Sequence, residues 1–158
     1  MKAVKVSDQV IELRDVPDPK GEGVIVAVKA VGICGSDLHL IDANMMVVTP
    51  GHEISGTTPN GKFVAIEPML SCGECSYCNR GSQPYCESAL PNTMGIGIDG
   101  GMAEKVIVPE RFLTPLPKSV SIQDAFLTEP LAVAVRSLLR VKANSVNRVV
   151  VVGGGTIG

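Results

Sequence analysis

The chain has 158 residues, of which 45% are hydrophobic and 3% aromatic, and its formal net charge is -2. This length allows one compact domain with a core and is short for two. The charge and the scarcity of aromatic rings argue against a nucleic-acid partner, because neither a basic patch nor a set of stacking rings is present.

Short β-type runs separated by Gly and Pro occupy the first two-thirds of the chain. The first of them, in MKAVKV, is charged and alternating, so we expect neither a signal peptide nor a membrane span, and a cytoplasmic protein. Asn60-Gly61 predicts a hairpin turn. The pattern indicates a mainly β fold, an irregular barrel or sandwich. The predicted strands are Lys2–Val6, Val10–Val16, Val24–Val31, Lys62–Ile66 and Glu104–Val108.

Two candidate metal ligands lie between these strands. Cys34 is part of the run GICGSDLH (32–39), where a short helix can begin after a strand, a position that favours the metal-binding thiolate. Further along, His52 is followed by Glu53. A cysteine, a histidine and a carboxylate with a fourth position left open have the composition of a catalytic zinc site. Simple packing of Cys34 or His52 is the alternative.

A separate lobe is predicted at Leu70–Asn92, which is rich in Cys, Gly, Ser, Asn and Pro and lacks apolar periodicity. Its cysteines have the spacing C-x2-C-x2-C-x7-C, which suits a structural zinc ion held by four thiolates. An iron–sulfur cluster uses similar spacing, and four merely buried cysteines are a further alternative. A closed shell of four thiolates would fold the lobe without taking part in catalysis. The four ligands are Cys72, Cys75, Cys78 and Cys86.

The pattern becomes helical after Ser121, which can cap a helix over Ile122–Leu127. A second helix is predicted over Leu131–Val141, with Pro130 in its first turn. The β-branched run Arg148–Val152 predicts a strand buried on both faces of a parallel sheet.

The sequence GGGTIG (153–158) follows this strand and satisfies G-x-G-x-x-G. Such a turn lets a pyrophosphate approach the next helix, so Gly153, Gly155 and Gly158 are candidate cofactor-binding residues. The motif alone is weak, and a Gly-rich turn or a tag remnant is the alternative.

Taken in order, these motifs resemble the medium-chain zinc-dependent alcohol and polyol dehydrogenases. The resemblance rests on GICGSD (32–37), GHE (51–53), the four-cysteine lobe, DGGMAE (99–104) and TEPL (128–131). It implies a GroES-like irregular β-barrel over 1–144, with short helices and a zinc lobe at about 70–92. Residues 145–158 would then be the first strand and turn of an α/β Rossmann domain, so that the polypeptide is a fragment.

The resemblance also implies roles for individual residues. Cys34 and His52 would bind the catalytic zinc, and Asp37 would orient His52. Glu129 stands where ethanol-type members have a cysteine, and sorbitol and butanediol dehydrogenases share its Glu-Pro. Either Glu53 or Glu129 would complete the zinc shell, and the sequence does not choose between them.

The implied proton path uses Ser36 as acceptor of the substrate hydroxyl proton and His39 as its relay to solvent. The alternative is that Ser36 caps the helix and His39 is a solvated surface residue.

The function implied is oxidation of a secondary alcohol or polyol, or reduction of the ketone, with two zinc ions per chain and NAD or NADP, with NAD favoured. The active site of the family lies between two domains, so this polypeptide alone should bind zinc without turning over substrate. A homo-oligomer is expected for the full-length form. A glucose or threonine dehydrogenase of the same family, or a non-catalytic zinc-ribbon binding module, are the alternatives.

Overall fold

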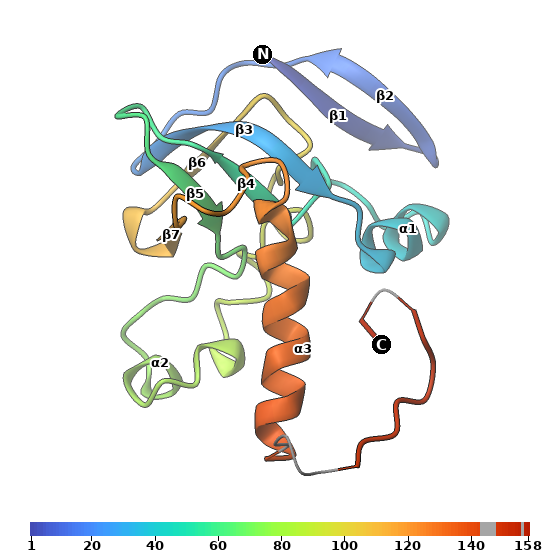
Figure 1. The fold of residues 1–158 in the computed structure, drawn as a ribbon. Helices are drawn as coiled ribbons and strands as arrows, with labels where there is room; N and C mark the ends of the chain where they lie inside the picture. Colours follow the sequence, from blue (N-terminus) through green and yellow to red (C-terminus); the bar gives the residue numbers. More distant parts are fainter. Residues whose placement is uncertain (143–147, 156) are drawn as a thin grey trace.

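The computed structural model describes residues 1–142, 148–155 and 157–158, and its strands form two antiparallel sheets (Figure 1). The smaller sheet pairs β1 (Lys2–Ser7) with β2 (Val10–Asp15). The larger has the order β6-β3-β4-β5-β7. Its strands are β3 (Val24–Gly32), β4 (Glu53–Thr57), β5 (Phe63–Ile66), β6 (Lys105–Val108) and β7 (Leu113–Pro115).

The core lies on one face of the five-stranded sheet, where alternate residues of its strands meet. Val26, Ile54, Val64 and Val106 are almost completely buried there, and Met94 packs on them from a loop. Each such side chain contributes roughly 1.5–3 kcal/mol relative to an exposed one. The sheet is therefore the rigid part of the molecule on which the loops are mounted.

Helices connect and flank the sheets. α1 (Gly35–Asp42) follows β3 directly, and α2 (Ser76–Asn79) belongs to the cysteine lobe. α3 (Thr128–Arg140) leaves the sheet and runs past that lobe (Figure 1). The part of the chain that the structure describes also contains three short 3₁₀ turns: η1 (Gln83–Tyr85), η2 (Glu110–Phe112) and η3 (Ala125–Leu127). No helix among the described residues is long and apolar enough to cross a membrane.

The five strands and the short helix predicted from the sequence are confirmed, with small shifts at their ends. The hairpin turn is confirmed as well: Gly61 has a φ of 79°, and the amide of Thr58 donates to the carbonyl of Lys62 at 3.0 Å. The prediction missed β4, whose sequence EISGT contains Gly, Ser and Glu, and the three-residue β7.

The helix expected over 122–127 is wrong, because only the 3₁₀ turn η3 forms there. The amide of Gln123 is 3.3 Å from the hydroxyl of Ser121, so the expected cap closes a local turn rather than starting a helix. The helix predicted from Leu131 exists but begins earlier, at Thr128, so that it includes Glu129 in its first turn.

The run Arg148–Val152 does not form a strand in this structure, contrary to the expectation from its β-branched sequence. Val150 is 86% exposed and Val152 is 96% exposed. A strand of a parallel sheet needs neighbouring strands and covering helices, and the described residues place none beside it. The expected boundary between residues 144 and 145 lies outside the described residues.

Candidate functional site

The cysteine lobe brings its four thiols together. One ligand atom from each of the four cysteines lies within 4.8 Å of all the others. The Sγ of Cys72 is 3.5 Å from that of Cys86 and 3.9 Å from that of Cys78. A tetrahedron of sulfurs around zinc, with bonds of about 2.3 Å, has edges of about 3.8 Å. The donor set and its spacing therefore fit a zinc ion.

Backbone amides of the lobe point at these sulfurs. Cys72 donates to the Sγ of Cys86, Gly73 to that of Cys78 and Cys75 to that of Cys72, each at 3.4 Å. Amide donors stabilise a thiolate relative to a thiol. Apart from the cysteines, Ala89 is the one fully buried hydrophobic residue in this cluster. Because so little apolar surface is buried, a bound metal would contribute much of the lobe's stability.

The ionisation of Cys86 provides a direct test of this arrangement. The amide of Cys72 lowers the pKa of the Cys86 thiol to about 6, against the opposing effect of burial. Since the pKa is lowered, the group is ionised above about pH 6 and protonated below it. In the metal-free, reduced chain we expect one thiolate to appear in the ultraviolet absorbance with that midpoint. Cys86→Ser should abolish this step, and a first midpoint near the ordinary thiol value would contradict the prediction.

A second cluster joins two loops at the end of the larger sheet. Ligand atoms of Cys34, His52 and Glu53 all lie within 4.8 Å of one another. Cys34 immediately precedes α1, and Glu53 begins β4, so each is held by a regular element. His52 and Glu53 are buried. A half-buried thiol beside a buried imidazole and a buried carboxylate suits a zinc ion with three protein ligands and one open position.

Asp37 ties the two loops of this cluster together. Its carboxylate accepts the amide of Cys34 at 2.9 Å and that of Gly51 at 3.3 Å. The same carboxylate lies 3.6 Å from Nδ1 of His52, a buried nitrogen that has no hydrogen-bond partner in the structure. Such a neighbour favours a proton on Nδ1 and leaves the Nε2 lone pair available to a metal. This placement agrees with the orienting role that the resemblance implies for Asp37.

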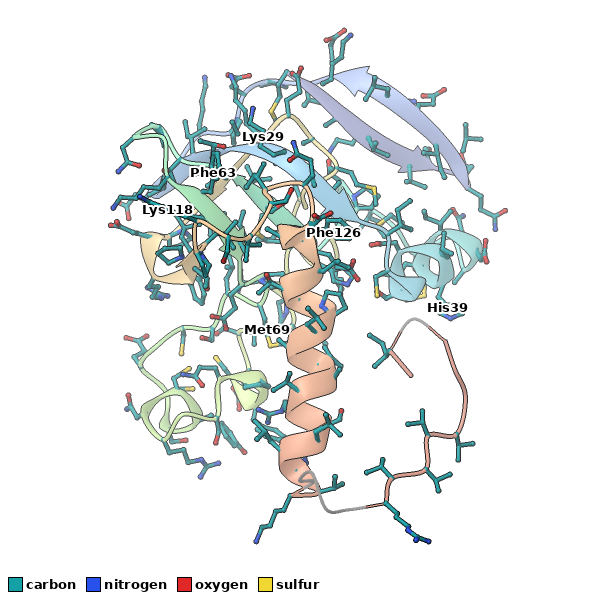
Figure 2. The ribbon with its side chains drawn as sticks, viewed as in Figure 1. Lys29, His39, Phe63, Met69, Lys118 and Phe126 are labelled. Carbon is teal, nitrogen blue, oxygen red and sulfur yellow. The ribbon has the colours of Figure 1, made fainter. Side chains whose placement is uncertain are left out.

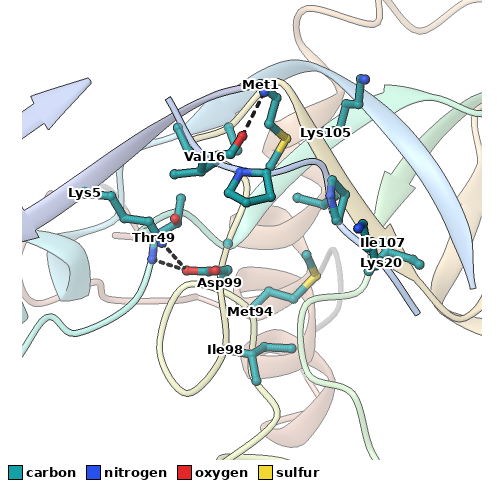
Figure 3. A pocket seen from close by; sticks show the side chains of 16 residues that line it. Met1, Lys5, Val16, Lys20, Thr49, Met94, Ile98, Asp99, Lys105 and Ile107 are labelled. Atoms are coloured by element: carbon teal, nitrogen blue, oxygen red, sulfur yellow. Dashed lines mark hydrogen bonds and ion pairs between the residues drawn. The ribbon is translucent and has the colours of Figure 1, made fainter. Parts of the chain in front are cut away.

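The segment before His52 is held from the other side by the loop around Asp99 (Figure 3). Asp99 accepts the amide of Thr49 at 2.6 Å and the ammonium of Lys5 at 2.9 Å. Burial raises the pKa of Asp99, but these two donors outweigh it and hold the pKa below its usual range. Gly100 and Gly101 then donate to the carbonyls of Thr49 and Gly51. The sequence analysis included this DGG motif in the resemblance without seeing that it positions the histidine loop.

Gly32 is a further residue whose role the sequence did not reveal. It lies opposite Glu53 in the ladder between β3 and β4. A Cβ on Gly32 would overlap the carboxylate of Glu53 and approach Cδ2 of Phe126 to 2.7 Å. Gly32 therefore leaves the space in which the Glu53 side chain reaches the cluster.

Among the described residues, Glu129 does not belong to the group whose ligand atoms meet, but it lines a cleft that His52 also lines. The cleft has a volume of about 490 Å³ and is lined by His52, Glu129 and Arg136, among others. Burial raises the pKa of Glu129, the charge of His52 lowers it, and that of Glu53 raises it further, so the net shift is upward. The structure thus brings Glu53 together with Cys34 and His52, whereas Glu129 lines the cleft together with His52, so which glutamate completes the zinc shell stays a prediction.

The two residues of the implied proton path are separated. The Oγ of Ser36 is 3.5 Å from Nε2 of His52, so Ser36 faces the cluster. His39 is exposed and projects from α1 away from the sheet (Figure 2). Among the described residues, the side chain of His39 forms no hydrogen bond with Ser36 or His52, so its relay role stays a prediction.

The three candidate cofactor glycines lie among the described residues. Gly153 has a φ of 92°, and a Cβ on Gly153 or Gly155 would meet nothing within 4 Å. Thr156, within the motif, lies outside the described residues. The role of Gly153, Gly155 and Gly158 therefore stays a prediction.

The mainly β fold places the chain in the class of GroES-like domains. The family described as "Alcohol dehydrogenase GroES-like domain" matches residues 20–118, and the chain belongs to it.

Individual relatives are enzymes named for polyols and their ketones. The chain is 34% identical to D-xylulose reductase A of Aspergillus oryzae, covering 98% of this chain and 47% of that protein. It is 31% identical to sorbitol dehydrogenase of Bacillus subtilis, and the match covers 94% of this chain and 46% of that protein. A solved structure of an Escherichia coli short chain alcohol dehydrogenase in complex with NADH aligns with a TM-score of 0.76 at 31% identity. The alignment covers 89% of this chain and 45% of that one. The chain spans about half the length of the curated relatives it matches.

Proposed function

We propose that this chain supplies the catalytic domain of a zinc-dependent dehydrogenase that interconverts a secondary alcohol or polyol and its ketone. The observation that carries the proposal is the meeting of Cys34, His52 and Glu53 beside an open cleft. The four thiolates of the separate lobe form a closed set, so only the cluster of Cys34, His52 and Glu53 offers a position for substrate. The names of the polyol-related relatives support the choice of substrate class.

Each residue in and around the cluster would have its own role. Cys34, His52 and Glu53 would hold a zinc ion, which as a Lewis acid makes the proton of a substrate hydroxyl removable near neutral pH. Ser36, facing Nε2 of His52, would receive that proton at its Oγ. Asp37 would hold the imidazole in the ligating tautomer. Glu129, whose pKa is raised, would face the substrate in the cleft and accept hydrogen bonds from its further hydroxyls.

A nicotinamide cofactor would take the hydride. Structural relatives bound to NADH and to NADP support a nicotinamide cofactor, and of the two we propose NAD. We further propose a second, structural zinc ion in the four-cysteine lobe and a homo-oligomeric full-length form. We also propose the cytoplasmic location expected from the sequence.

Metal analysis separates this proposal from a zinc-ribbon binding module. The chain purified without chelator is expected to hold two zinc ions, and Cys34→Ala combined with His52→Ala should remove one of them. Ser36→Ala is the matched control, since it changes a neighbour that is not a ligand, and it should retain both ions. An unchanged metal content in the double variant would favour the binding module.

Cobalt substitution tests whether the metal site of Cys34, His52 and Glu53 has an open coordination position. Adding a polyol such as sorbitol to the cobalt-loaded chain should shift the visible absorption bands, because the alcohol oxygen replaces water on the metal. The double variant should show no shift, since its remaining metal is enclosed by four thiolates. Two bound cobalt ions that respond to no alcohol would contradict the proposed function.

A further inference from the structure

The outer strand of the smaller sheet is unusually exposed for an edge strand with apolar residues. All six residues of β2 are exposed, and Val10, Ile11 and Leu13 are exposed to 55%, 59% and 68%. Among the described residues, β2 pairs with β1 alone. Figure 1 shows β2 as the outermost strand, with β1 between it and the rest of the molecule. One edge of β2 therefore presents unpaired backbone amides and carbonyls.

This edge is held in place by the strand behind it. Ala3 of β1 is buried and forms a bridge with Ala103. The amide of Val4 donates to the carbonyl of Met102 at 2.8 Å, and Lys5 is paired with Asp99. The free edge of β2 is thus preorganised, which reduces the entropy lost when another strand pairs with it.

The hairpin also has an apolar outer face. Val4 lies opposite Leu13 and Val6 opposite Ile11 in the ladder, so the four side chains share one face. The buried Ala3 is on the other face, which places these four away from the body of the molecule. A two-stranded sheet is marginal by itself, and added strands would extend this apolar face into a continuous one.

The charges on β2 select a partner and a register. A twofold axis perpendicular to the sheet pairs each residue i of β2 with a residue j of the identical strand. Within one register the sum i + j is the same even number for every pair. A sum of 24 places Glu12 opposite Glu12, and a sum of 28 places Arg14 opposite Arg14, both repulsive. The sum of 26 places Leu13 opposite Leu13 and Glu12 opposite Arg14 twice. β2 is therefore self-complementary in one of these three registers.

We propose that β2 is a docking edge for a second copy of this chain, which pairs antiparallel with it to form a four-stranded sheet β1-β2-β2-β1. Within one chain, Arg14 and Glu12 already form an ion pair at 2.5 Å, and both side chains are about half exposed. In the dimer, the Glu12–Arg14 pair of one chain would lie beside the same pair of the other chain, so that the four charges alternate in sign. The twofold pairing uses the only free edge of each hairpin among the described residues, so the assembly closes at two copies.

Sedimentation of charge-reversed variants tests this interface. The unaltered chain should show a reversible, concentration-dependent dimer. Glu12→Arg alone places two arginines opposite each other, and Arg14→Glu alone places two glutamates opposite each other, so each variant should weaken dimerisation at least tenfold. Mixing the two variants should restore it as a heterodimer, because one strand then carries two arginines and its partner two glutamates.

Controls with the same change in net charge lie away from the hairpin. Glu110→Arg and Arg140→Glu alter exposed residues and should leave the dimer unchanged. Circular dichroism establishes that each variant is folded. The proposal is overturned if the unaltered chain is monomeric at every concentration, forms larger assemblies, or dimerises equally well in both single variants, or if mixing them restores nothing. None of these outcomes depends on zinc or on the proposed activity.

Discussion

Replacing Cys86 with Ser is expected to release one zinc ion and to unfold the segment 70–92 while the five-stranded sheet stays intact. The reason is the composition of the lobe, in which the buried cluster outside the cysteines consists of Ala89 with a flanking Met69. Binding of zinc at a structural site contributes about 10 kcal/mol or more to the free energy of folding. Nothing in this cluster approaches that value, since one buried methylene contributes about 0.8 kcal/mol.

Hydrogen exchange and metal content measure the effect together. Amides of the lobe should lose protection in Cys86→Ser, whereas those of β3 and β4 should keep theirs. Glu87→Gln is the matched control, because it changes the exposed neighbour of Cys86 and should retain both zinc ions and the protection of the lobe. If the Cys86→Ser lobe remains protected without metal, the lobe has another source of stability and the structural-zinc assignment fails.

Gly32→Ala is expected to destabilise the fold by about 1–3 kcal/mol and to weaken metal binding at the Cys34 cluster. The added methyl group would occupy the space of the Glu53 carboxylate and press on Phe126. Gly32 does not have a positive φ, so the effect would come from this collision and not from backbone strain. Denaturant unfolding of the metal-free chain measures the stability, and competition with a chelator measures the metal affinity.

A matched glycine provides the control for this substitution. Gly35→Ala adds the same methyl group at the start of α1, where it would meet nothing within 4 Å, and should be neutral or slightly stabilising. Combining Gly32→Ala with Glu53→Ala should cost less than the sum of the two changes, because the second removes most of the collision. Equal costs in the presence and absence of Glu53 would show that the two residues do not interact.

Local sequence signals were sufficient to predict those features that depend on residues close together in the chain. The cysteines of the lobe are grouped by their spacing, and the structure brings them together as the spacing predicts. The alternating runs became strands because period-two patterns describe a half-buried sheet. β4 escaped prediction because its residues from Glu53 to Gly56 are all buried, so its pattern does not alternate and its composition resembles a loop.

The position of Glu53 shows what tertiary structure adds. The pairing of β3 with β4 shifts by one residue between Val28 and Ala30, leaving Lys29 without a partner in the ladder. Such a bulge reverses which face each following residue occupies. Beyond it, Glu53 lies opposite Gly32 and reaches the cluster through the space that this glycine leaves. Nothing in the sequence around Glu53 encodes that register.

The sequence by itself determined the family, the mainly β fold, the cysteine lobe and the residue types from which a metal site could be built. These follow from short spacings and from periodicity, which near neighbours in the chain control. Only the tertiary structure brought Glu53 together with Cys34 and His52, placed Glu129 in the lining of the cleft beside His52, and showed how Asp99 and Gly32 support the site. Those relations depend on strand register and loop contacts between distant segments, and long-range pairing is set by the packing of the whole domain.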